Sequence, residues 1–200
     1  MITRRHLLQI SAGAMAVMTA DSSLAQEPSE QAVFFDKNAP VLGNAKGNVT
    51  VVEYFDYQCP HCKTMHPTLM KVVKEDGNVR LVMKDWPVFG DVSVFAAQAT
   101  LGAAQIGKYE AALEALMSTS GRLTHESIEE ALTGRGMTMK EIAAAVNKHF
   151  AKISGLLDRN YLQAVAFGFI GTPSFVIGRT TYPGVLDEKG LREAIAAART

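Results

Sequence analysis

The spacing of apolar residues predicts two short strands joined by a helix in the first half of the chain. Residues 49–55 and 79–84 are rich in β-branched and aromatic side chains, which favour strands. Between them, apolar side chains recur at steps of three and four, at Met65, Leu69, Val72 and Val73. That spacing is typical of one face of a helix, and Gly77 marks the end of the helix. We expect the two strands to be parallel and the βαβ unit to be right-handed.

A helical pattern rich in alanine extends over residues 90–167. Its first helix has an apolar face made of Val94, Ala97, Leu101 and Ala104. Thr138 and Glu141 form a capping box, which predicts the start of a later helix. A further helix is expected over residues 150–164. This block therefore contains several helices and no strand.

Three more segments complete the pattern. Residues 174–177 predict a third strand, residues 180–182 its hairpin partner, and Asp187 the cap of a last helix. A short edge strand is also expected at residues 32–35. The order strand, helix, strand, helical block, strand, strand and helix predicts an α/β fold with a large helical insertion at about residues 90–170.

The first 25 residues have the pattern of an export signal. A positively charged start at Arg4 and Arg5 precedes an apolar stretch. The segment ends with small residues at Ser23 and Ala25, and a signal peptidase would cut after Ala25. The two arginines match both a twin-arginine signal and the positive start of any Sec signal, so both routes stay open. The apolar stretch is shorter than the roughly 20 residues of a spanning helix. We expect export without a permanent anchor, cleavage after about Ala25, and residues 26–200 as one domain.

Charge and cysteine content narrow the functional classes. The 200 residues carry 20 Lys+Arg and 20 Asp+Glu, so no basic excess indicates a nucleic-acid partner. Two cysteines cannot scaffold a domain of this size, and the fold must rest on a buried core. We therefore expect no nucleic-acid binding, and the position of the two cysteines becomes the main clue.

The cysteines lie two residues apart at the predicted start of the helix after the first strand, in the sequence Cys59-Pro60-His61-Cys62. A helix N-terminus offers unpaired N–H groups that stabilise a thiolate. Pro60 suits the first turn because its missing N–H has no partner there anyway, and His61 adds a donor and partial positive charge. A stabilised thiolate favours the reduced pair and makes the disulfide a good oxidant.

Three other interpretations of the pair are weaker. Haem attachment requires histidine at position 63, which is Lys63 here. A zinc site usually needs two such cysteine pairs, although Cys59, Cys62 and His66 could recruit a soft metal. A structural disulfide that closes so short a loop would contribute little stability. Redox chemistry is the favoured interpretation, and no metal or other cofactor is expected.

Two segments resemble a known family. Residues 55–63 (Phe-Asp-Tyr-Gln-Cys-Pro-His-Cys-Lys) are similar to the active site of the DsbA family of thiol:disulfide oxidoreductases. Gly171-Thr172-Pro173, ahead of a strand, resembles the cis-proline loop of the thioredoxin fold. With the helical block between the two halves, the resemblance covers residues 33–199. It implies a thioredoxin fold with a large helical insertion between its βαβ and ββα halves.

The resemblance also implies roles for individual residues. Cys59, the more exposed N-terminal sulfur, would be the nucleophile and Cys62 the resolving thiol. Pro173 would be cis, with the Thr172 backbone pairing with a client peptide; an ordinary trans turn proline is the alternative. Glu53 resembles a buried acid that relays protons to Cys62, or else it faces solvent on an alternating strand.

Further residues carry simpler expectations. His66 is expected to be an exposed helix residue, and Pro67 to kink its helix. Trp86 and Met65 are expected in the core, although Met65 could line a client-binding surface.

The expected activity is that of a monomeric, periplasmic dithiol oxidase. It would donate the Cys59–Cys62 disulfide to reduced exported proteins and be reoxidised by a DsbB-like membrane quinone oxidoreductase. Thr172 departs from the valine usual before the cis-proline in the best-known oxidases, which leaves the redox potential open. A disulfide isomerase or reductase that uses the same cysteines is therefore one alternative. A non-enzymatic metal-handling or chaperone protein is the other.

Overall fold

A mixed five-stranded sheet forms the centre of the computed structural model, which describes residues 28–199. The strand order is β1-β3-β2-β4-β5. The strands are β1 (Val41–Gly43), β2 (Val49–Phe55), β3 (Val79–Asp85), β4 (Ser174–Ile177) and β5 (Thr180–Pro183). Only β2 and β3 pair in parallel, as the sequence predicts, and the other neighbours are antiparallel.

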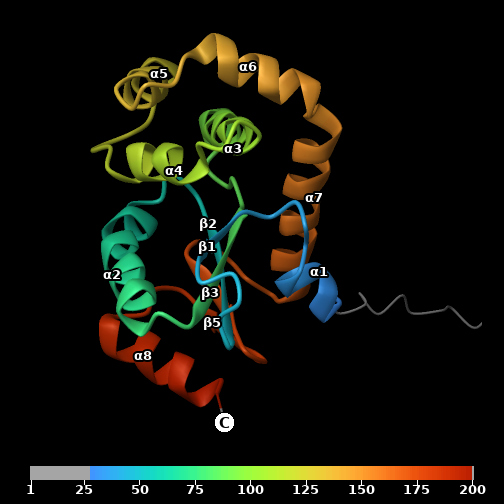
Figure 1. The fold of residues 1–200 in the computed structure, drawn as a ribbon, viewed down its shortest axis with the longest axis vertical. Helices are drawn as coiled ribbons and strands as arrows, with labels where there is room; N and C mark the ends of the chain where they lie inside the picture. The colour runs from blue at the N-terminus through green and yellow to red at the C-terminus, as the bar shows by residue number, and fades with distance from the viewer. Residues whose placement is uncertain (1–27, 200) are drawn as a thin grey trace, which may run out of the picture.

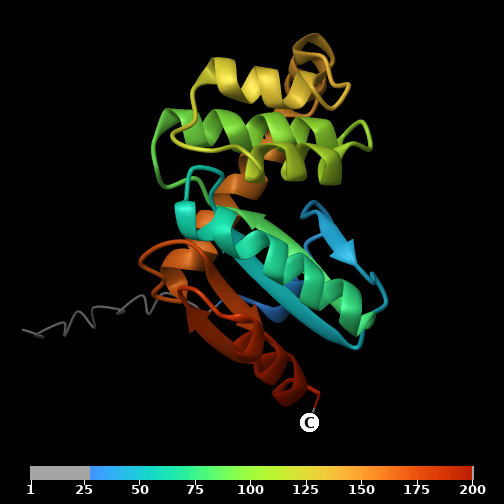
Figure 2. The same cartoon turned by 90° about the vertical axis from the view of Figure 1, so that its left-hand side faces the viewer.

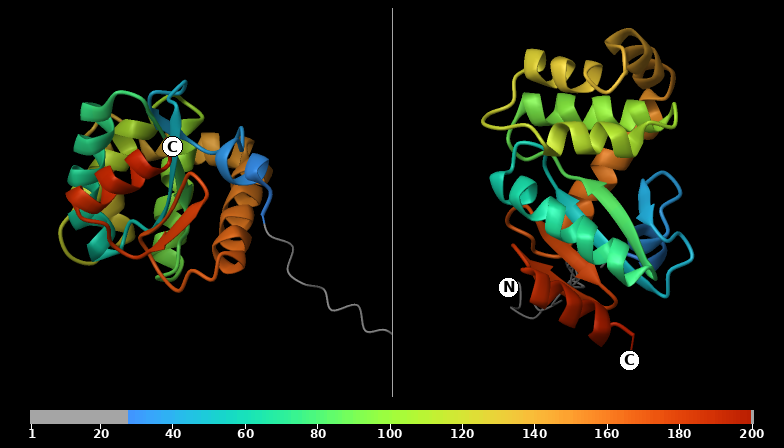
Figure 3. Two further views of the ribbon diagram at one scale, coloured as in Figure 1. Left: turned by 90° about the horizontal axis from the view of Figure 1, so that it is seen from below. Right: turned by 60° about the vertical axis from the view of Figure 1, so that its left-hand side comes forward.

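Helices cover both faces of the sheet (Figure 1). On one side lie α2 (Pro60–Asp76) and α8 (Glu188–Ala197), and on the other α1 (Glu30–Phe34) and α7 (Phe150–Ala166). Figure 2 shows α2 and α8 side by side in front of the strands, and Figure 3 repeats the layering from below. The α/β prediction is confirmed: this is a thioredoxin-like fold with a helical insertion.

The insertion stands over one end of the sheet as a separate helical layer (Figures 1 and 2). Before the chain returns through α7, the layer contains α3 (Asp91–Ala104), α4 (Tyr109–Met117), α5 (His125–Thr133) and α6 (Met139–Lys148). The capping box of Thr138 and Glu141 begins α6 as predicted, and Thr124 with Ser127 makes a second one at α5.

Strand register brings the candidate site to the edge of the sheet beneath this layer. Because β2 and β3 are parallel, both end there, with Phe55 opposite Asp85. Strand β4 starts at the same edge, with Ser174 opposite Tyr54. The loop before β4 therefore meets the turn after β2, although more than 100 residues separate them in the sequence.

Helix α2 begins directly after that turn. Cys59 is its N-cap, Pro60 occupies the first turn, and Gly77 ends it at φ +69°, a left-handed conformation suited to glycine. Pro67 lies inside the helix and removes one backbone N–H from its ladder.

The N-terminal part of the domain differs from prediction. The expected edge strand at residues 32–35 is wrong, because this segment forms the end of α1 and its C-cap, and the Ser29 side chain caps the helix start by accepting from the Ala32 N–H. The edge of the sheet is instead β1, three residues that the sequence pattern did not indicate. Both segments are too short for periodicity to distinguish strand from helix.

The predicted export signal lies outside the described residues. Within residues 28–199, no helix combines the length and the apolar character needed to cross a bilayer.

Candidate active site

The two cysteines lie at the start of α2, and both are thiols in this structure. The backbone N–H of Cys62 points at the Cys59 sulfur, with 3.4 Å between nitrogen and sulfur. The Cys59 sulfur also lies 3.2 Å from the Thr172 carbonyl oxygen, to which the thiol form can donate. The expected difference in exposure is small, since Cys59 is 2% exposed and Cys62 is fully buried. Both sulfurs are therefore almost completely shielded from solvent.

The surroundings shift the pKa values of the two thiols in opposite directions. A hydrogen bond from the Cys62 thiol is the largest effect that lowers the pKa of Cys59, which falls to about 5 despite burial. The backbone N–H groups of Cys62 and His61 act in the same direction. Burial raises the pKa of Cys62 far above its ordinary value, and the neighbouring Cys59 and Glu53 add to the rise. At neutral pH the pair is thus one thiolate and one thiol.

His61 itself is exposed, so its contribution to the sulfur comes through its backbone N–H. Pro60 is exposed as well and shapes the rim beside Cys59. The sequence placed both residues at the helix start, and the structure agrees.

The loop before β4 closes over the sulfur from the opposite side. The Thr172–Pro173 peptide bond is cis, as predicted, and Pro173 is buried. Ser174 fixes the loop by donating its hydroxyl to the Gly171 carbonyl at 2.7 Å. The Thr172 hydroxyl is buried without another hydrogen-bond partner among residues 28–199, and its proximity to the sulfur helps to lower the pKa of Cys59.

We expect Thr172→Val to raise the pKa of Cys59 by up to about one unit, because it removes a hydroxyl near the thiolate and keeps the side-chain shape. Thiolate absorbance near 240 nm, followed through an acid titration, measures this directly. The wild-type midpoint is expected at about pH 5. Thr180→Val, on the exposed hairpin strand, is the matched control. A wild-type midpoint near that of free cysteine would contradict this account.

Glu53 lies in the middle of β2 and is fully buried, so the solvent-facing alternative is wrong. Neither carboxylate oxygen has a hydrogen-bond partner among residues 28–199. Burial raises the pKa of Glu53 to about 8, with smaller contributions from Cys59 and Asp85. The carboxyl group is therefore largely protonated at neutral pH and can give up a proton close to the cysteines.

Sequence reasoning missed a second buried acid, Asp85. The strand register places it on the same face of the sheet as Glu53, two positions further along. Burial raises the pKa of Asp85 to about 7, partly opposed by the Tyr57 hydroxyl. The side chains of Tyr57 and Tyr109 are buried as well, and Asp85 acts electrostatically on both hydroxyls. Its position as an acidic residue at the end of an apolar strand is the signal in the sequence that could have identified Asp85.

A second missed residue, Asp56, holds the turn in place. Its side chain accepts hydrogen bonds from the backbone N–H groups of Gln58, Val88 and Phe89 and from the Ser93 hydroxyl, at 2.7 to 3.2 Å. These bonds tie the turn before Cys59 to the segment that enters α3. An aspartate directly after a strand is a common turn signal that could have identified it.

Replacing Asp56 with alanine should lower the free energy of unfolding by about 3 kcal/mol, because several buried donors lose their acceptor. Asp158→Ala, an exposed aspartate on α7, should change it by less than about 0.5 kcal/mol. Urea denaturation of the two variants measures the difference. Equal stabilities would show that the Asp56 side chain does not hold this turn.

The expectation for His66 is wrong. It is 3% exposed, and its Nε2 lies 2.8 Å from a carboxylate oxygen of Glu114 on α4, which links α2 to the helical layer. The helical pattern alone could not show that another helix covers this face. Within residues 28–199, no group of three or more potential metal-binding side chains is placed to hold a metal ion.

Trp86 and Met65 are buried, as predicted. Met65 also lines a hollow of about 230 Å³ between α2 and the start of α8, together with His61 and Val185. This hollow borders the same helix turn as Cys59, so the geometry is compatible with the predicted client-binding role of Met65.

Comparisons with known proteins agree with this geometry. The thioredoxin family model matches residues 36–197. A thioredoxin-like oxidoreductase from Silicibacter pomeroyi superposes with a TM-score of 0.83 and 38% identity, covering 86% of this chain and 98% of that one.

Two curated relatives carry names from the same chemistry. The thiol:disulfide interchange protein DsbA of Pseudomonas aeruginosa is 26% identical over 182 residues, or 86% of this chain and 83% of that protein. A Rickettsia typhi protein named as a protein-disulfide oxidoreductase is 28% identical over 159 residues. That match covers 71% of this chain, and the chain spans only 55% of the rickettsial protein.

Proposed function

Because the chain belongs to the thioredoxin family, among its DsbA-like oxidoreductases, we propose that it is an exported dithiol oxidase that donates the Cys59–Cys62 disulfide to reduced proteins. The observation that carries the proposal is the contrast between the two thiols. The pKa of Cys59 is lowered to about 5, whereas burial raises that of Cys62. A pair with one stabilised thiolate favours its reduced form, and its disulfide is correspondingly oxidising.

The reaction begins when a client thiolate attacks the Cys59 sulfur of the oxidised pair. A client–Cys59 bond forms, the Cys59–Cys62 bond breaks, and Cys62 leaves as a thiolate. Because burial raises the pKa of Cys62, this thiolate takes up a proton, and the neutral Glu53 carboxyl is the nearby donor.

A second client thiolate then attacks the client sulfur of the mixed disulfide. Cys59 departs easily because its thiolate is stable. The client gains a disulfide and loses two electrons, and the protein retains both electrons as the reduced pair. The Thr172 backbone, next to Cys59, would pair with the extended client.

The remaining parts of the proposal rest on the sequence. The leader at residues 1–25 supports export to the periplasm, where the clients would be reduced exported proteins. A DsbB-like membrane quinone oxidoreductase would remove the two electrons, and the enzyme would act as a monomer. An isomerase or reductase would use the same two sulfurs, but its Cys59–Cys62 pair would have to be in the reduced dithiol form.

Trapping thiols in intact cells tests the choice between these activities. After rapid acid quenching and alkylation, the wild-type pair should be mostly oxidised, because an oxidase must carry a disulfide to its clients. Deleting the quinone-linked partner should shift the pair to the reduced form. A mostly reduced pair in otherwise unperturbed cells would favour the isomerase or reductase.

A further inference from the structure

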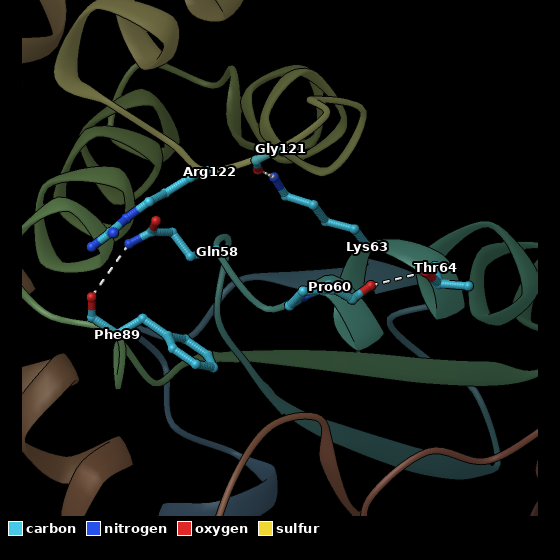
Figure 4. A pocket seen from close by; sticks show the side chains of 7 residues that line it. All are labelled: Gln58, Pro60, Lys63, Thr64, Phe89, Gly121 and Arg122. Carbon is cyan, nitrogen blue, oxygen red and sulfur yellow. Dashed lines mark hydrogen bonds between the residues drawn. The ribbon is translucent and has the colours of Figure 1, made fainter.

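A groove of about 570 Å³ runs beside the cysteine turn, between α2 and the helical layer (Figure 4). Its walls come from three separate places: the first turn of α2, the loop between α4 and α5, and the segment that enters α3. The lining residues are Gln58, Pro60, Lys63, Thr64, Phe89, Gly121 and Arg122. The groove therefore adjoins the helix turn that Cys59 begins.

The two charged residues that line the groove are both cations. Lys63 reaches from α2 to the opposite loop, where its ammonium donates to the Thr119 hydroxyl at 2.8 Å and lies 3.5 Å from the Gly121 carbonyl. Arg122 extends from that loop toward Gln58 and Phe89 (Figure 4). Among the ion pairs within residues 28–199, neither side chain has a carboxylate partner.

Asp56 acts electrostatically on Lys63 but forms no ion pair with it among residues 28–199. Asp56 raises the pKa of Lys63, but burial outweighs it and the net pKa is lowered. Both oxygens of Asp56 are already occupied by the four hydrogen bonds that hold the turn. The positive charge of the groove therefore remains available to a bound group.

We propose that this groove is a subsite for an acidic side chain of the client polypeptide, close in sequence to its reacting cysteine. Pro60 and the ring of Phe89 offer apolar contacts for the aliphatic part of a glutamate, while Arg122 and Lys63 offer donors to its carboxylate. The inference rests on the proposed function, because it requires a client at Cys59.

The hollow on the other flank of the α2 turn has the opposite character. It is lined by Asp187 and Glu188 beside His61. Glu188 is ion-paired with Lys71 and Arg192, so this hollow offers an acidic client residue no unpaired lysine or arginine, whereas the groove offers two cations without a carboxylate partner. This difference between the two flanks gives the client a preferred direction across Cys59.

The test uses three reduced peptides, each with two cysteines. They are identical except at the positions two residues before and two residues after the cysteines, where one peptide has Glu, one has Ala and one has Lys. The rate at which each peptide reduces the oxidised protein is measured by stopped flow at low salt. For the wild type, the Glu peptide should react up to about fivefold faster than the Ala peptide, and the Lys peptide slower. The preference should shrink above about 0.5 M NaCl.

Arg122→Glu should reverse the preference, so that the Glu-to-Ala rate ratio falls below one, and Arg122→Lys should largely retain it. Arg135 is an exposed arginine in the turn between α5 and α6. Arg135→Glu changes the net charge by the same amount as Arg122→Glu and should keep the Glu-to-Ala rate ratio at its wild-type value. Equal wild-type rates for the three peptides, or the same ratio in Arg122→Glu and Arg135→Glu, would overturn the subsite while the oxidase proposal stands. Failure to oxidise any peptide would overturn the proposed function, and the subsite with it.

Discussion

Replacing Cys62 with serine should turn the protein into a trap for oxidised clients, because the Cys59 thiolate attacks the client disulfide, expels one client sulfur and stays joined to the other, whereas Cys59→Ser should capture none. In the proposed sequence of steps, the sulfur of Cys59 forms the bond to the client. Cys62 is fully buried behind it, and burial raises its pKa, so it cannot replace Cys59 as the attacking or attacked group. Steady-state peptide oxidation should fall at least about a thousandfold in either variant, as it does when other enzymes lose their nucleophile.

Non-reducing gel electrophoresis after acid quenching shows the trapped species, and mass spectrometry identifies the joined cysteines. Trapping through Cys62 in the Cys59→Ser protein would contradict the assigned order of the two sulfurs. Full activity of Cys59→Ser in cells would show that the protein's role does not depend on thiol–disulfide exchange at Cys59, and would favour the chaperone interpretation.

The second large effect concerns stability and its dependence on pH. Burial raises the pKa of Glu53 to about 8, so the folded protein holds this proton more tightly than the unfolded chain, whose ordinary value is 4.5. Stability must therefore fall as pH rises from about 4.5 to 8. The loss attributable to Glu53 reaches about 4 kcal/mol at pH 8. Asp85 acts in the same direction, since the pKa of its buried carboxyl is raised from 3.8 to about 7.

Glu53→Gln should thus be more stable than the wild type at pH 8 by about 4 kcal/mol and nearly equal to it near pH 4.5. Urea denaturation across this pH range measures the difference, with the exposed Glu129→Gln as the matched control. The same variant should react more slowly with reduced peptides near neutral pH, because protonation of the departing Cys62 loses its donor. A difference in stability that stays constant with pH would show that Glu53 is not a buried titrating group.

Features that short sequence segments encode were predictable. The β-branched runs at residues 49–55 and 79–84 became β2 and β3, and the capping box at Thr138 and Glu141 began α6. The cysteine turn was also visible, because an N-cap and a first-turn proline are local signals. The cis Thr172–Pro173 bond required the resemblance to a known family, since most bonds before proline are trans.

Features that depend on distant segments were not predictable from the chain pattern. His66 is buried only because α4 packs across α2, a contact between residues 48 positions apart. The cationic groove needs the loop at Arg122 to meet the turn at Pro60. At residues 32–35, helix and strand compete over a stretch too short for periodicity to decide.

The redox equilibrium of the Cys59–Cys62 pair in glutathione buffers tests the central claim most directly. Because the Cys59 thiolate is stabilised, reduction of the disulfide is favoured, and the midpoint should lie nearer to the roughly −120 mV of DsbA than to the roughly −270 mV of thioredoxin. A midpoint at or below about −230 mV, in the range of reductants, would contradict the dithiol oxidase.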